Sequence, residues 1–243
     1  MEEIKVLEEF LSLSLESSDP VLQRFGNLPG AVHRDGGDGR RFVYVPGSRK
    51  DRIVLVAHAD TVWTLWGRER TSRPHRVVRE NGIFRSESSG LGADDRAGCA
   101  ILWLLKDSGH SLLVTDGEEK GQLGSWFLVE ECPDIYDEIN ETHGFMVEFD
   151  RRNAADFKCY DVGTDDFRSY VASVTGYAEP DRRAFTDICT LCRDICGVNL
   201  SVGYYHEHSA QEYLSIREWR HTLDLCRSWL GSADLPRFAL EPR

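Results

Sequence analysis

The sequence predicts an α/β fold in three layers: a central mixed, largely parallel β-sheet that helices flank on both faces. One observation is that apolar runs of strand length alternate with segments of helical periodicity, as with Ile53–Ala57 before 94–106 and Ser111–Val114 before Ser125–Glu131. Another is that Ile53–Ala57 is apolar throughout, which is typical of a strand covered on both faces. The 243 residues contain neither an internal repeat nor a linker, so we expect one domain, residues 1–243.

Turn residues and apolar spacing define the other elements. Asn81-Gly82 between two short apolar runs is a strong hairpin signal, because both residues accept the positive φ of a tight turn. In the helix that begins near Asp94, apolar residues recur every three or four positions, and Gly109 can end it. We further expect a helix at residues 3–15, strands at Ala31–His33, Phe42–Val45, Val77–Val78, Ile83–Phe84, Gly144–Phe149 and Leu200–Tyr204, and helices at Phe167–Ser173, Arg182–Cys196 and Gln211–Leu230.

Composition limits the functional classes. A net charge of −12 argues against a nucleic-acid partner, because neutralising phosphates needs a basic face. No apolar run reaches the length of a membrane helix, and the acidic, amphipathic N-terminus is unlike a signal peptide. Seven cysteines, an odd number, fit a reducing compartment better than a disulfide framework. We therefore expect a cytoplasmic protein with no membrane partner.

Side chains that can bind metal occur in five places, each just after an expected strand or at the start of an expected helix. Imidazoles and carboxylates hold zinc, manganese or cobalt, and ligands collect at the carboxyl ends of strands in open α/β sheets. Each place alone has an ordinary explanation, such as a solvated strand end, but five in succession do not arise easily that way. The five places are His58-Ala-Asp60, Asp94-Asp95, Glu118-Glu119, Asp150 and His208.

Local spacing favours particular roles within these places. His58 and Asp60 are two residues apart, so in an extended segment both point to one side, where the carboxylate can orient a metal-bound imidazole. Helix capping accounts for one of Asp94 and Asp95, and we assign to Asp94 a bridge between two metals. The two glutamates beside a cation can divide the work, one binding metal and the other carrying protons.

At two of the five places, a second residue nearby could be the metal ligand instead. Glu148 has the same strand parity as Asp150, and His206 has the same parity as His208. Because alternate residues of a strand face the same side, strand phase does not choose within either pair.

The ordered set resembles the co-catalytic zinc exopeptidase superfamily, which includes tripeptide, glutamyl and bacterial leucyl aminopeptidases and the aminoacylase/carboxypeptidase group. Residues 91–98, Leu-Gly-Ala-Asp-Asp-Arg-Ala-Gly, are most similar to the tripeptide and glutamyl aminopeptidase versions. Residues 56–62, Val-Ala-His-Ala-Asp-Thr-Val, resemble the first metal motif. The resemblance covers about residues 1–230, and the ordered set is far more specific than any single motif.

The resemblance implies two divalent metal ions, with zinc expected first and manganese or cobalt as alternatives. It favours Asp150 over Glu148 and His208 over His206, while Asp95 remains the alternative to Asp94. The implied roles are His58 and Asp150 on one metal, Glu119 and His208 on the other, Asp94 between them, Glu118 as the general base, and Asp60 orienting His58.

The chain departs from the family in one respect. Several members insert a lid or dimerisation domain between the last two ligands. Asp150 and His208 are only 58 positions apart, and two expected helices fall between them. We therefore expect a bare catalytic domain without an inserted lid.

These observations predict a di-metal-dependent hydrolase that cleaves peptide bonds, in the leading interpretation an aminopeptidase-type exopeptidase. The alternatives are a metal-dependent amidohydrolase or deacylase and a non-catalytic, peptide-binding relative. We expect a small peptide or amide as the substrate. The sequence carries no signal for an oligomeric state.

Two further features have a weaker link to function. Cys189, Cys192 and Cys196 have the spacing of a possible metal cluster, but no second Cys-x-x-Cys completes a tetrahedral site. We instead expect one buried helical face made of Phe185, Ile188, Cys192, Ile195 and Cys196. Arginines within segment 67–76, and Arg151 with Arg152, could bind a substrate carboxylate, although a solvated loop explains the former as well.

Overall fold

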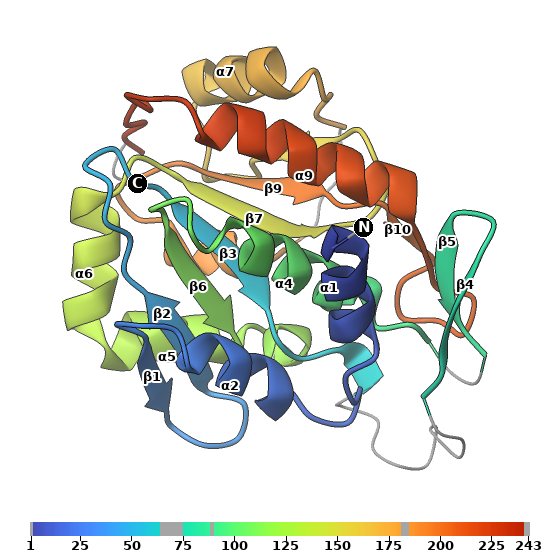
Figure 1. Ribbon diagram of the computed structural model, residues 1–243. Helices are drawn as coiled ribbons and strands as arrows, with labels where there is room; N and C mark the ends of the chain where they lie inside the picture. The colour runs from blue at the N-terminus through green and yellow to red at the C-terminus, as the bar shows by residue number, and fades with distance from the viewer. Residues whose placement is uncertain (1, 64–74, 88–89, 181–184, 241–243) are drawn as a thin grey trace.

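The computed structural model describes residues 2–63, 75–87, 90–180 and 185–240. The main sheet has seven strands in the order β1-β2-β6-β3-β7-β9-β8 (Figure 1). Strands β6, β3, β7 and β9 form a parallel core, whereas β1, β2 and β8 run antiparallel to their neighbours. The expected mixed sheet is thereby confirmed. The strands are β1 Val32–Asp35, β2 Arg41–Val45, β3 Val54–His58, β6 Ser111–Thr115, β7 Met146–Arg151, β8 Phe157–Lys158 and β9 Gly197–Ser201.

Helices cover both faces of this sheet, and each face has its own apolar core (Figure 1). Alternation along β3 shows why its sequence is apolar throughout: Leu55 and Ala57 enter one core, and Val54 and Val56 enter the other. On the first face lie α1 Glu2–Leu11, α2 Asp19–Gly26, α4 Ala93–Leu105, α7 Asp165–Thr175 and α9 Ile216–Leu230, and on the second lie α5 Leu123–Glu131, α6 Pro133–Thr142 and α8 Asp187–Leu191. None of the described helices is long and apolar enough to cross a membrane.

A second, four-stranded sheet has the order β10-β11-β5-β4. The expected hairpin is present, with Asn81 and Gly82 at positive φ between its two strands. Strand β11 pairs with β5, so a segment near residue 213 is attached to the hairpin. The strands are β4 Val77–Glu80, β5 Ile83–Ser86, β10 Tyr204–Tyr205 and β11 Tyr213–Ser215.

Three expected helices are shorter than predicted. The one expected at residues 3–15 ends at Leu11. The closing helix begins at Ile216 rather than Gln211, because Tyr213–Ser215 pair with the distant strand β5, a contact that local spacing does not reveal. The expected helix Arg182–Cys196 is helical only over Asp187–Leu191 among its described residues, and 181–184 lie outside them. The chain becomes extended at Cys192 on its way to β9.

The helices α2 and α6 were not predicted. Each has a proline at its first or second position, Pro20 in α2 and Pro133 in α6. Proline is favoured there because its fixed φ suits a helix and its missing N–H has no intrahelical partner to lose. That signal was present in the sequence and could have identified both helices.

Candidate metal centre

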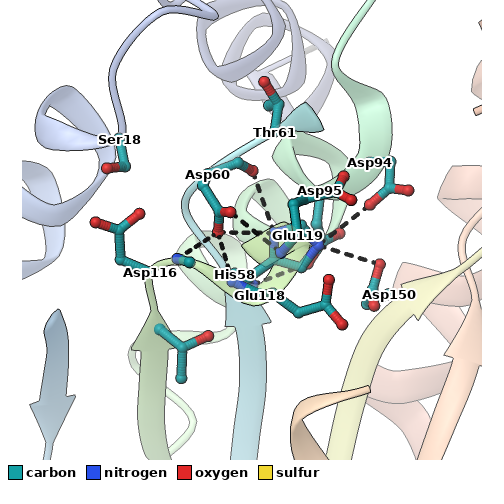
Figure 2. A network of polar contacts seen from close by, with 12 residues as sticks. Ser18, His58, Asp60, Thr61, Asp94, Asp95, Asp116, Glu118, Glu119 and Asp150 are labelled. Carbon is teal, nitrogen blue, oxygen red and sulfur yellow. Dashed lines mark hydrogen bonds and ion pairs between the residues drawn. The ribbon is translucent and has the colours of Figure 1, made fainter. Parts of the chain in front are cut away.

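The five predicted places meet at the carboxyl ends of β3, β6 and β7. His58 ends β3, and Asp94 stands at the start of α4. Glu118 and Glu119 lie in a short 3₁₀ turn after β6, η1 Glu118–Lys120, and Asp150 is near the end of β7. His208 comes from the loop between β10 and β11. Figure 2 shows the carboxylates from three of these elements grouped around His58.

Asp94 lies between the two imidazoles. Its Oδ1 is 3.1 Å from Nε2 of His58, and its Oδ2 is 3.1 Å from Nε2 of His208. His208 Nε2 is also 2.9 Å from Oε1 of Glu119. The two oxygens of one carboxylate therefore face nitrogens of two different imidazoles, which is the arrangement that a bridging carboxylate requires.

On the other side of His58 lie Asp150 and Glu118. Asp150 Oδ1 is 3.4 Å from His58 Nε2. Potential ligand atoms of His58, Glu118 and Asp150 all lie within 4.8 Å of one another, and so do those of His58, Asp94 and Glu119. The cluster therefore consists of two overlapping groups that share His58.

Asp60 connects the strand end that carries His58 to the turn that carries the glutamates. Its Oδ1 accepts hydrogen bonds from the backbone N–H of Gly117 (2.9 Å) and Glu118 (3.1 Å), and its Oδ2 accepts one from Glu119 N–H (3.2 Å). The same Oδ1 is 3.3 Å from Nδ1 of His58. Asp60 thus fixes the imidazole and the glutamate turn together (Figure 2).

Asp95 has a different environment from Asp94. It is fully buried, and backbone N–H groups engage both of its oxygens, Gly98 N–H at 2.9 Å and His58 N–H at 3.2 Å. A Cβ on Gly98 would lie 2.4 Å from the Asp95 carboxylate, so the glycine allows this close approach. Of the two aspartates, Asp95 is the one that caps the helix and Asp94 the one that faces the histidines.

The alternative ligands Glu148 and His206 also differ in their surroundings from Asp150 and His208. Among the described residues, the close groups of ligand atoms contain Asp150 but not Glu148, which is completely buried on the same strand. His206 is exposed, and its ring packs against Tyr213 with 5.8 Å between centroids. His208 instead contacts Asp94 and Glu119.

The buried cluster contains more carboxyl groups than imidazoles, so its negative charge is not fully compensated. Burial and the nearby Asp94 carboxylate raise the pKa of Asp150 to about 7. Burial likewise raises the pKa of Glu118 well above its usual range, and the neighbouring carboxylates add to the effect. Hydrogen bonding to Asp94 and Glu119 raises the pKa of His208 to about 11. Buried carboxyl groups that raise one another's pKa in this way, with imidazoles among them, fit divalent cations.

Several supporting contacts were not predicted. Glu212 is buried and accepts hydrogen bonds from the N–H groups of Gly92 (2.7 Å) and Asp94 (3.1 Å), which holds the segment that presents Asp94. Thr186 donates to Asp150 Oδ2 at 3.0 Å, and Tyr204 donates to its Oδ1 at 3.2 Å. These contacts join segments far apart in the chain, so no local sequence signal marks them.

The cluster opens into a cleft of about 350 Å³. Its lining includes four of the five proposed ligands, Asp94, Glu119, Asp150 and His208, together with the aromatic residues Tyr160, Phe185 and Tyr204, and both Arg151 and Arg152. We expected Phe185 to lie on the buried face of a helix, and this was wrong: it precedes α8, and its side chain is 72% exposed beside the cleft.

Neither Arg76 nor any of the cysteines is among the residues that line the cleft. Arg68, Arg70 and Arg73 lie outside the described residues, and Arg76 is exposed and pairs with Glu87 at 3.0 Å. All seven cysteines are free thiols. Cys196 is buried, and Cys189 and Cys192 are partly buried.

Solved structures of peptidases share this fold. Aminopeptidase PepT from Bacillus cereus matches with a TM-score of 0.64 and 14% identity over 94% of this chain and 97% of its own. A tripeptidase from Staphylococcus aureus matches with 0.65 and 12% over 95% and 98%. The TET1 peptidase of Pyrococcus horikoshii matches with 0.62 and 13% over 94% and 99%.

The protein is therefore an α/β protein that shares the fold of these peptidases. The family resemblance of the motifs is thus supported by the fold as well. At 12–14% identity the likeness concerns the fold alone. No family model matches the sequence, and no curated protein sequence matches it.

Proposed function

We propose that the protein is a hydrolase of peptide bonds that uses two divalent metal ions, and that it acts as an aminopeptidase-type exopeptidase. One observation carries the proposal: the two oxygens of Asp94 each lie 3.1 Å from a different imidazole nitrogen. The peptidases that share the fold support the same class of reaction.

In this proposal His58 and Asp150 would hold one ion, Glu119 and His208 would hold the other, and Asp94 would serve both. Zinc is the expected metal, because imidazole and carboxylate ligands suit it, and manganese or cobalt would fit the same donors. Bound there, two such ions lower the pKa of water toward neutrality and polarise a carbonyl group.

The protein side chains would then move the proton and hold the geometry. Glu118 accepts a proton from the water that attacks the amide carbonyl and returns it to the departing amine. Asp60 keeps His58 and the glutamate turn in register through the hydrogen bonds described above. Tyr204 and Thr186 orient Asp150.

The proposal also covers the extent and location of the catalytic unit. We propose that residues 1–243 form one catalytic domain without an inserted lid. In support, the segment between Asp150 and His208 supplies β8 and β9 to the main sheet and α7 and α8 to its two faces. Seven free thiols are in keeping with a cytoplasmic location.

The direct test compares wild type with Glu118→Gln and with Glu141→Gln, an exposed control on α6. Zinc-loaded protein is incubated with a pool of short peptides, and released amino acids and bound metal are both measured. Glu118→Gln should keep its metal and lose about 10²- to 10⁴-fold in turnover, and the control should behave as wild type.

Other outcomes favour the alternatives. Metal binding with cleavage of N-acylated amino acids, but of no peptide, would favour a deacylase. Metal binding with no hydrolysis of either class would favour a peptide-binding relative. Equal turnover in wild type and Glu118→Gln would remove Glu118 from the proton-transfer role.

A further inference from the structure

The cleft contains two arginines among its described lining residues, and they differ in how they are used. Arg151 is almost fully buried, with its side chain 6% exposed, and its Nε donates to Asp156 at 2.8 Å. The side chain of Arg152 is 34% exposed and pairs with Glu207. Of these two, Arg152 is therefore the guanidinium that a molecule entering the cleft can reach.

We propose that Arg152 binds the terminal carboxylate of the substrate, so that the preferred substrates are di- and tripeptides with a free C-terminus. This inference rests on the proposed function. It adds the substrate class, and it assigns the selection of that class to one side chain.

Arg152 lies close in the chain to a proposed metal ligand. Arg152 follows the proposed ligand Asp150 by two residues, and both line the cleft. Two residues of extended chain span at most about 7 Å, so the two Cα atoms are no further apart than that. A bound peptide covers the same distance with about two residues. A carboxylate one or two residues beyond the cleaved bond would therefore lie in the region of Arg152.

The charge and volume of the cleft agree with a short, anionic-ended peptide. Five of the twelve lining residues carry carboxyl groups, which disfavour an anionic group in the cleft. A substrate carboxylate therefore needs a local counter-charge, and Arg152 can offer one. A volume of about 350 Å³ lies at the lower end of the roughly 300–1,000 Å³ that is usual for small-molecule sites.

Glu207 holds Arg152 in place without using all of its donors. The contact involves Nη1 of Arg152. Nε and Nη2 have no other hydrogen-bond partner in the part of the chain that the structure describes, and a guanidinium can pair with a carboxylate through two donors at once. Glu207 also directly precedes His208, so the same pair ties the arginine to the loop that carries a proposed metal ligand.

The test uses L-leucylglycine and its C-terminal amide, L-leucylglycinamide, with zinc-loaded wild type, Arg152→Gln and Arg217→Gln. Arg217 is a matched control on α9, with a side chain 91% exposed. The readout is the ratio of kcat/KM for the acid to kcat/KM for the amide. Wild type and the control should prefer the acid, and Arg152→Gln should lower the ratio by about 10- to 100-fold.

The ratio separates carboxylate binding from a structural role. If Arg152 only holds the His208 loop, Arg152→Gln should lower kcat/KM equally for the two substrates and reduce the amount of bound zinc. The ratio would then stay unchanged, which would overturn the inference. A wild type that cleaves both substrates equally well would also overturn it, while the proposed function would stand. A wild type that binds zinc and cleaves neither substrate, nor any peptide of a mixed pool, would instead remove the proposed function, and the inference with it.

Discussion

Asp60 lies outside the proposed ligand set, yet its contacts determine the geometry of the site. Its carboxylate accepts three backbone N–H groups from the turn of Glu118 and Glu119 and lies beside Nδ1 of His58. Burial disfavours the charge on Asp60, but its contacts with His58 and with backbone N–H groups lower its pKa overall. A carboxylate therefore suits this position better than a neutral side chain.

We expect Asp60→Asn to weaken zinc binding or kcat/KM by about 10- to 100-fold, because the amide loses the charge and presents an NH₂ group to backbone donors. Zinc affinity is measured by competition with a chelator, alongside turnover. Asp107→Asn is the control, since that side chain is 87% exposed. An Asp60→Asn protein with unchanged affinity and rate would show that Asp60 does not orient the site.

The candidate residues could be predicted because each follows an apolar run or begins a helix. His58 and Asp150 needed only the rule that the carboxyl ends of parallel strands meet at one edge of the sheet. Glu212 could not be found in this way, since it reaches the Asp94 segment from 118 residues away through a loop. Contacts of that kind depend on how loops fold back over the sheet.

At the scale of elements, buried polar contacts join the helices to the sheet away from the site. His143 follows α6, is fully buried, and contacts Ser111 Oγ on β6 through Nε2 at 2.7 Å. Its Nδ1 is 3.0 Å from the carbonyl oxygen of Ile139, so Nδ1 donates and Nε2 accepts in the neutral ring. Burial, aided by the positive charge of Arg52, lowers the pKa of His143 to about 4.

This pKa has a consequence for stability in mild acid. Between pH 6.5 and about 4 the unfolded chain binds a proton on His143 that the folded protein does not, so this group lowers stability as the pH falls. We expect His143→Gln to lose about 1–2 kcal/mol less than wild type between pH 7 and pH 5 in urea unfolding. His33→Gln, at an exposed position, is the control. Parallel pH profiles for wild type and His143→Gln would contradict the assignment.

Elements were predictable where one local rule dominated and were missed where pairing across the chain decided. The hairpin at Asn81-Gly82 and the buried strand β3 have unambiguous local signals. Tyr213–Ser215 carries apolar residues that also fit a helix, and only its pairing with β5 makes it a strand. Such competition between local spacing and distant pairing is not visible in a single sequence.

Negative charge characterises both the whole molecule and its cleft. The chain has a net charge of −12, and the cleft gathers the carboxylates of Asp94, Glu118, Glu119, Asp150 and Glu207. Burying so many acidic groups together is costly unless cations compensate them. The parallel core of the sheet brings these groups together, so the proposed metal centre depends directly on the fold.

The most direct measurement is anomalous diffraction at the zinc edge from crystals grown with zinc. The account predicts two peaks about 3.5–4 Å apart on either side of Asp94, one beside His58 and Asp150 and the other beside Glu119 and His208. Each peak should lie about 2.0–2.2 Å from its nitrogen and oxygen ligands. No zinc at these residues, or zinc held only elsewhere on the protein, would contradict it.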